Sequence, residues 1–246
     1  MDYKNLERLH QSVRSDLVAY CDKLTSVLGG NLKAISVYGS AAGPDFIPGK
    51  SDVNLVIVVE KLGGAVLTSL LETVKWGKKK RIVPPLLLTP DYIETSLDVF
   101  PIEFLEIREG QVLLMGEDFF SGLEVKPLEM RLECESQLKA AALRTRQAYL
   151  EIGMTKRGAE EVLHASLTSL IPVMRAMLRL KGEAIPRLKL DVLKAVSRVF
   201  GVDCGRLESI LKDKTGDEKI GNSRAHEVLA LYVEDIERLA AAVDGL

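Results

Sequence analysis

The chain has 246 residues, with 33 lysines and arginines against 35 aspartates and glutamates, and a net charge of −2. Its length allows one large domain or two modest ones, and its balanced charge argues against a surface that coats nucleic acid. The three cysteines are far apart in the sequence, so neither a disulfide scaffold nor a zinc site is predicted. The charged N-terminus and the absence of a long apolar run lead us to expect a cytoplasmic protein with no signal peptide and no membrane segment.

The first part of the chain alternates between helical and strand-like patterns. Residues 2–28 carry apolar side chains at helical spacing and are followed by Gly29-Gly30, which predicts an amphipathic helix. Two apolar runs rich in β-branched residues follow, at 35–38 and 53–59, and the Gly, Pro and Asp residues around them favour buried strands. A second amphipathic helix is predicted over residues 65–76.

The residues between these two strands carry the candidate chemistry. The Gly39-Ser40 turn can present backbone N–H groups and a hydroxyl to phosphate oxygens. Asp52, at the start of the second strand, can hold the magnesium ion that such phosphates carry. Lys50 and Ser51 directly precede Asp52, so they are further candidate nucleotide contacts. Asp52 could instead serve only as the capping residue of a turn.

This stretch resembles the signature of the polymerase-beta-like nucleotidyltransferase superfamily. Gly39-Ser40, eleven residues, and then Asp52-Val53-Asn54 with an apolar strand follow that signature of Gly-Ser, a variable loop, Asp-x-Asp or Asp-x-Glu, and a strand. The resemblance implies an α+β fold, in which a nucleotidyltransferase-type mixed sheet flanked by helices is followed by an all-α helical bundle, as in the aminoglycoside and kanamycin nucleotidyltransferases. The sequence departs from the signature at Asn54, which stands where the family has its second carboxylate.

The spacing of Asp52 and Asn54 has a geometric meaning. Residues i and i+2 of a strand point to the same face, so two acids at these positions can share divalent metal ions. Two magnesium ions about 3.5–4 Å apart can clamp the attacking and leaving oxygens of a nucleotidyl transfer. Asn54 keeps one oxygen ligand but lacks the negative charge that magnesium prefers. We therefore expect the site to bind a single Mg²⁺, brought in with the nucleotide.

The next part of the chain predicts more strands and a third acidic candidate. Residues 82–88 contain two prolines and fit an edge strand or an interrupted one, and residues 100–107 and 112–115 are predicted to be further strands. The superfamily has a third carboxylate on a strand beside its acidic pair. The resemblance assigns Glu103 to that position, as a metal ligand or as a general base. Glu106 is the alternative, and it would lie on the opposite face of such a strand.

The composition changes near residues 122–127, which predicts a boundary between a nucleotidyltransferase-like domain, 1–125, and a helical bundle, 126–246. Helices are expected in the second domain at roughly 128–152, 157–180, 188–200, 204–212 and 219–243. Arg144, in the first of these helices, is a candidate to reach the nucleotide from a cleft between the domains. The basic run 78–81 could bind a triphosphate, but we interpret it as a solvated surface.

These features support two functional hypotheses. The first is a metal-dependent enzyme that transfers a nucleoside monophosphate from ATP or another NTP to a hydroxyl of a small molecule or a protein. In this enzyme Asp52, Asn54 and Glu103 would bind Mg²⁺, and Asp52 and Glu103 would also be catalytic. The nucleotide contacts would be Gly39, Ser40, Lys50, Ser51 and Arg144. The second hypothesis, favoured by Asn54, is a catalytically impaired nucleotide-binding or regulatory module on the same fold. Either protein could form a homodimer, and neither is expected to bind nucleic acid.

Overall fold

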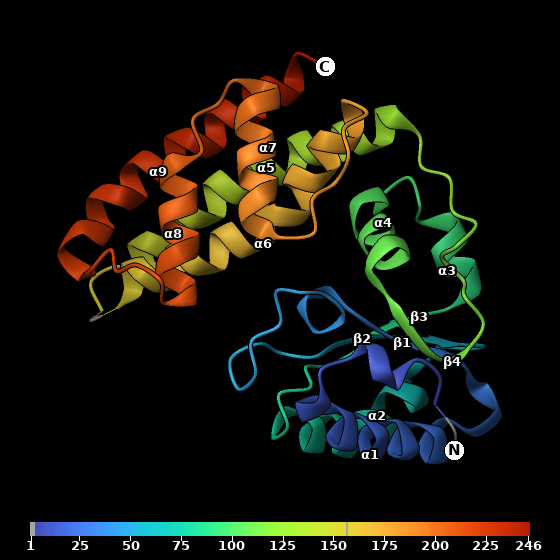
Figure 1. Cartoon of the computed structure of the whole chain (residues 1–246). Helices are drawn as coiled ribbons and strands as arrows, with labels where there is room; N and C mark the ends of the chain where they lie inside the picture. Colours follow the sequence, from blue (N-terminus) through green and yellow to red (C-terminus); the bar gives the residue numbers. More distant parts are fainter. Residues whose placement is uncertain (1–2, 156) are drawn as a thin grey trace. The chain divides into compact units, whose positions relative to one another are not determined.

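The structure is a computed structural model that describes residues 3–155 and 157–246, except for the side chains of residues 222 and 223. It divides into two compact units, of which the first ends at Val125 and the second runs from Lys126 to Leu246. Figure 1 shows that strands occur in the first unit, whereas the described part of the second unit is helical.

The first unit is built on a mixed four-stranded sheet in the order β3-β2-β1-β4. Its strands are β1 (Leu32–Tyr38), β2 (Asn54–Val59), β3 (Leu86–Leu88) and β4 (Val112–Gly116). β1 pairs antiparallel with both β2 and β4, and β2 pairs parallel with β3. The strands predicted at 35–38, 53–59 and 112–115 are confirmed. The proline-containing run 82–88 supplies only the short edge strand β3, as its composition predicted.

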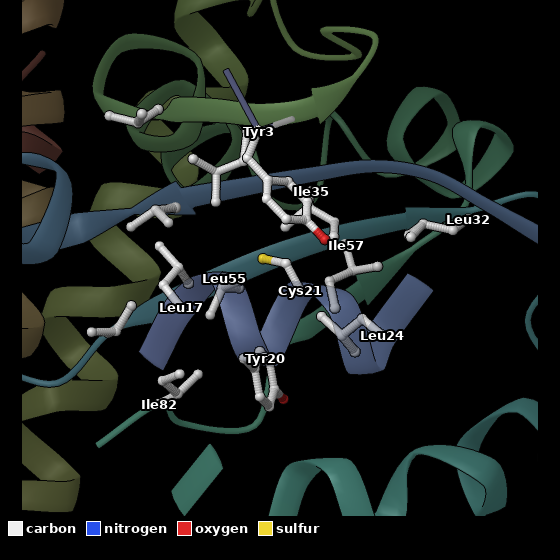
Figure 2. Close-up of a cluster of buried hydrophobic side chains, with 14 of the residues drawn as sticks. Tyr3, Leu17, Tyr20, Cys21, Leu24, Leu32, Ile35, Leu55, Ile57 and Ile82 are labelled. Atoms are coloured by element: carbon white, nitrogen blue, oxygen red, sulfur yellow. The ribbon is translucent and has the colours of Figure 1, made fainter. Parts of the chain in front are cut away.

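Two helices, α1 (Gln11–Leu28) and α2 (Gly64–Lys78), lie on one side of this sheet (Figure 1). Figure 2 shows Leu17, Cys21 and Leu24 of α1 directed toward the strands, where they join a buried cluster with side chains of β1 and β2. The first predicted helix is shorter than expected. His10 forms its N-cap and accepts a hydrogen bond from the Ser12 N–H at 3.2 Å, so α1 begins at Gln11. Asp2, where that prediction began, lies outside the described residues.

Two further helices, α3 (Pro90–Thr95) and α4 (Pro101–Gly110), lie on the other side of the sheet (Figure 1). Phe104 and Ile107 of α4 pack there with Val56 and Val58 of β2. The strand predicted over 100–107 is therefore wrong. Pro101 occupies the first helical turn, where its fixed φ is favourable and no N–H is needed. The buried positions 104 and 107 then have the i, i+3 spacing of a helix face.

The second unit consists of five helices in its described part, and this confirms the predicted all-α region. They are α5 (Pro127–Ile152), α6 (Gly158–Leu180), α7 (Lys189–Phe200), α8 (Gly205–Thr215) and α9 (Asn222–Asp244). α6 packs against the other four and carries more of the described buried residues than any of them, although it contains Pro172. Nowhere in the described part of the chain is a helix both long and apolar enough to cross a membrane.

Candidate functional site

The Gly39-Ser40 turn follows β1 directly. Both residues begin the short 3₁₀ segment η3 (Gly39–Ala42), which closes with a hydrogen bond from the Gly43 N–H to the Ser40 carbonyl at 3.1 Å. Gly39 has a φ of +71°, in the left-handed region that side-chain-bearing residues rarely adopt. The backbone therefore requires a glycine at this point, as a tight turn after a buried strand predicts.

Asn54 lies beside this turn because of the register between β1 and β2. Tyr38, the residue before Gly39, is paired with Asn54 across the two strands. A Cβ atom on Gly39 would lie 3.0 Å from the Asn54 Nδ2 atom, so the amide approaches the glycine backbone closely. The structure thus brings together two of the predicted site residues, Gly39 and Asn54.

The face of β2 on which Asn54 lies follows from the alternation of its neighbours. Val56 and Val58 pack with the cluster on the α4 side, whereas Leu55 and Ile57 pack with the α1 cluster. Residues two apart on a strand share a face, so Asn54 belongs to the α4 side. Tyr38 also packs against the α4-side cluster. The candidate site is therefore at the end of β1 and the start of β2, on the sheet face that α4 covers.

Asp52 is exposed and forms an ion pair with Arg81, whose Nη2 lies 3.1 Å from the Asp52 Oδ1. The same guanidinium donates from Nε to the Ser51 carbonyl at 3.4 Å and from Nη2 to the Lys50 carbonyl. The Ser51 hydroxyl accepts the Ile47 N–H at 2.9 Å and so holds the loop. The predicted residues Lys50, Ser51 and Asp52 thus form one loop segment, and Arg81 contacts all three of them.

Arg81 is the site residue that the sequence interpretation missed. It belongs to the basic run 78–81, which we took as a solvated surface, and its side chain is 48% exposed. Its distance from Asp52 in the sequence gave no reason to pair the two. The parallel bridge between Val53 and Ile82 brings them together, because Val53 follows Asp52 and Ile82 follows Arg81.

Glu103 does not lie on a strand beside β2 but in the first turn of α4, where its own side chain is exposed. It is nevertheless near the site, because α4 packs against η3 and β1. Burial raises the pKa of Tyr38, and the negative charge of Glu103 raises the pKa of this tyrosine further. Glu106 was expected on the face opposite Glu103. On a helix, residues three apart are neighbours, so that expectation is wrong together with the strand.

The donor chemistry of the site limits which metal it can hold. Its exposed carboxylates are Asp52, which is paired with Arg81, and Glu103 in the first turn of α4, and Asn54 offers a neutral amide. Among the described residues, no three His, Cys, Asp or Glu side chains form a group that could hold a metal ion. Magnesium prefers several hard, anionic oxygen ligands. These donors do not fit a resident pair of metal ions, and they fit at most one ion, with Asp52 as its anionic ligand.

Other predicted residues and cavities belong to separate parts of the chain. Arg144 is exposed on α5 in the second unit, so its contact with the nucleotide stays a prediction. A cavity of about 440 Å³ in the second unit is lined by residues of α8, α9 and the segment between them. A smaller one of about 230 Å³ is lined by Lys33, Glu60 and Phe119 among others. Neither cavity is lined by a predicted site residue.

Comparison with known proteins supports the fold. No protein-family model matches the chain, and no curated protein matches its sequence. Among solved structures, the chain is similar to spectinomycin adenyltransferase AAD(9) from Enterococcus faecialis, determined with ATP and spectinomycin. The similarity has a TM-score of 0.58 at 12% sequence identity and covers 91% of this chain and 99% of that one. The nucleotidyltransferase-type fold that the sequence predicted is therefore confirmed.

Proposed function

We propose that this protein is a nucleotidyltransferase that transfers a nucleoside monophosphate from ATP or another NTP to a hydroxyl group. The observation that carries the proposal is the close approach of the Gly39-Ser40 turn to Asn54, which follows the Asp52 loop in the sequence, in a chain whose fold is similar to that of an adenyltransferase. The structural neighbour is named for spectinomycin and was determined with ATP. ATP and a small hydroxyl compound are accordingly the first donor and acceptor to test.

The chemistry assigned to the site is an in-line displacement at the α-phosphorus. The acceptor oxygen forms a bond to that phosphorus while the bond to the bridging oxygen of the β-phosphate breaks, and pyrophosphate leaves. The backbone of the Gly39-Ser40 turn and the Ser40 hydroxyl hold the β- and γ-phosphates. Glu103 accepts the proton of the attacking hydroxyl. Most of the rate enhancement comes from positioning and from charges placed in advance.

Magnesium enters this scheme as part of the nucleotide substrate. When bound, it neutralises phosphate charge as the leaving group departs. Asp52 would be its protein ligand, with the Asn54 side-chain oxygen as a weaker neutral one. To hold such an ion, Asp52 would have to give up part of its contact with Arg81.

Titration calorimetry of ATP with and without Mg²⁺ tests the proposal, using the wild type and the Asp52→Ala variant. Magnesium-dependent binding that is lost in this variant supports the site. A matched control is Asp98→Ala, because Asp98 is another exposed carboxylate of the same unit. Pyrophosphate release would then be followed with spectinomycin and a panel of other hydroxyl compounds. Failure of the wild type to bind ATP, GTP, CTP or UTP under either condition would overturn the proposal.

A second candidate function is a nucleotide-binding module on this fold that no longer turns over. Asn54 favours it, because a neutral amide stands where the family signature has a carboxylate. The two functions differ in one measurable respect. A module of this kind would bind the nucleotide but release no pyrophosphate with any acceptor, whereas an enzyme would release it in proportion to the acceptor consumed.

A further inference from the structure

We propose that Arg81 binds the triphosphate in this site and that its ion pair with Asp52 is the nucleotide-free arrangement, which the nucleotide opens. The inference rests on the proposed function and adds to it a residue outside the family signature. It assigns to the Arg81 guanidinium the neutralisation of phosphate charge that a second metal ion would otherwise supply.

The contacts of Arg81 leave it able to receive phosphate. The guanidinium contacts Asp52 at 3.1 Å and the Ser51 carbonyl at 3.4 Å, yet the arginine and aspartate side chains remain 48% and 54% exposed. An exposed ion pair is weak, because water competes for both charges. A triphosphate offers more negative charge than one carboxylate, and a guanidinium matches phosphate oxygens with a planar fork of donors.

The backbone of Arg81 is held close to the site at both of its polar groups. Its carbonyl accepts the Val53 N–H at 2.8 Å, and Val53 lies between Asp52 and Asn54 in the sequence. Its own N–H donates to the Lys78 carbonyl at 3.3 Å at the end of α2. The side chain therefore starts from a fixed point next to the metal-binding positions, so little order has to be created when a nucleotide arrives.

The conformation of Arg81 is one that glycine would adopt more readily. The Ile82 N–H donates to the Gly77 carbonyl at 3.0 Å, and with the Lys78 contact this forms the Schellman arrangement at the C-terminus of α2. In this motif Arg81 occupies the left-handed position, with a φ of +59°. An arginine is disfavoured there and lowers the stability of the fold, and a role of its side chain in the site accounts for its presence.

The charges around Asp52 are consistent with this role. The signature of two carboxylates would suit two divalent ions, but this chain has one carboxylate and an amide, with a permanent cation beside them. Arginine keeps its charge at all physiological pH values. Asn54 removes one negative charge from the site and Arg81 adds one permanent positive charge. The site therefore needs less positive charge from metal ions to bind a triphosphate.

The alternative role for Arg81 is purely structural, as a staple across the Lys50–Asp52 segment. The two roles differ in how the effect of a substitution depends on the number of phosphates. A phosphate-binding arginine affects ATP more than ADP and affects AMP least. A loop staple affects all three nucleotides alike, because the loop is disturbed whichever ligand binds.

Titration calorimetry of ATP, ADP and AMP at fixed Mg²⁺ separates these roles, using the wild type, Arg81→Met and Arg81→Gly. We expect Arg81→Met to weaken ATP binding by about tenfold or more, since charged hydrogen bonds are lost, and to change AMP binding little. Lys79→Met is the matched control, since it removes an equal charge from the same exposed run, and it should change ATP binding less than about threefold.

Arg81→Gly shows whether a loss of ATP affinity comes from the missing side chain or from a loss of stability. Glycine relieves the left-handed backbone, so this variant should have a higher denaturation midpoint than Arg81→Met while losing ATP affinity equally. Wild-type affinity for ATP in Arg81→Met, or an equal loss for ATP and AMP, would overturn the inference and leave the proposed function standing. If the wild type binds no nucleotide at all, the proposed function itself fails, and the inference fails with it.

Discussion

Asn54 and Gly39 are in close contact across the β1–β2 pair, where a Cβ atom on Gly39 would lie 3.0 Å from the Asn54 Nδ2 atom. The contact links the Gly39-Ser40 turn to the strand position that departs from the family signature. Any side chain at Gly39 must therefore displace the Asn54 amide as well as adopt a φ of +71°.

Gly39→Ala is expected to weaken ATP binding and to lower the free energy of unfolding by about 1–2 kcal/mol, through left-handed strain. Chemical denaturation and ATP calorimetry measure the two effects. Gly43→Ala is the control in the same loop, because a Cβ there meets only ordinary contacts, at 3.7 Å from the Gly39 carbonyl. Equal stability of both variants would show that the turn tolerates a side chain at Gly39.

Asn54→Asp restores the second carboxylate of the signature. Magnesium prefers anionic oxygen ligands, so the Mg²⁺ concentration needed for half-maximal ATP binding should fall by about tenfold, in line with what changes near a metal usually cost. Asn54→Ala is the control, and it should raise that concentration or leave it unchanged. An unchanged magnesium requirement in the aspartate variant would place Asn54 outside the metal-binding region.

Glu103→Gln should lower the pKa of Tyr38. Burial is the main cause that raises the pKa of this phenol, and the nearby Glu103 charge adds to it by disfavouring a second negative charge. Removal of the charge therefore shifts the titration of Tyr38 to lower pH, although burial keeps it above the ordinary value of 10.0. NMR titration of labelled tyrosine rings measures the change. Glu106→Gln is the control that should leave Tyr38 unaffected.

Gly77→Ala should destabilise the first unit, although alanine is normally the better helix former by about 1 kcal/mol. A Cβ on Gly77 would lie 2.5 Å from the Tyr20 Cε2 atom. The Tyr20 ring is buried and stacks on Trp76 with centroids 6.3 Å apart, so it has little room to move. We expect a loss of about 1–3 kcal/mol from overpacking. Gly64→Ala, which meets no atom within 4 Å, should not show this loss in the same denaturation assay.

The three cysteines should be unreactive in the native protein. Burial raises the pKa of the Cys21, Cys134 and Cys204 thiols to about 12 in each case. The reactive thiolate is therefore scarce at pH 8, and the sulfur atoms are also inaccessible. A thiol assay with an aromatic disulfide should count three thiols in denaturant and almost none before unfolding. Rapid reaction of one thiol in buffer would contradict the burial of that residue.

The sequence by itself determined the local parts of this fold. The β-branched runs around the Gly39-Ser40 turn and Asp52 are bounded by residues that break both helices and strands, so their identity as β1 and β2 depended on near neighbours. The helical second unit followed in the same way from apolar spacing.

Only the tertiary structure decided the two features that depend on distant partners. The run 100–107 is short and mostly apolar, so its period is ambiguous, and packing of Phe104 and Ile107 on the sheet made it the helix α4. Arg81 meets Asp52 because the segment after α2 pairs beside Val53, and no local pattern encodes that pairing. A clear local period determines which element a segment forms, whereas an ambiguous run such as 100–107 and an ion pair between distant residues depend on how the elements pack together.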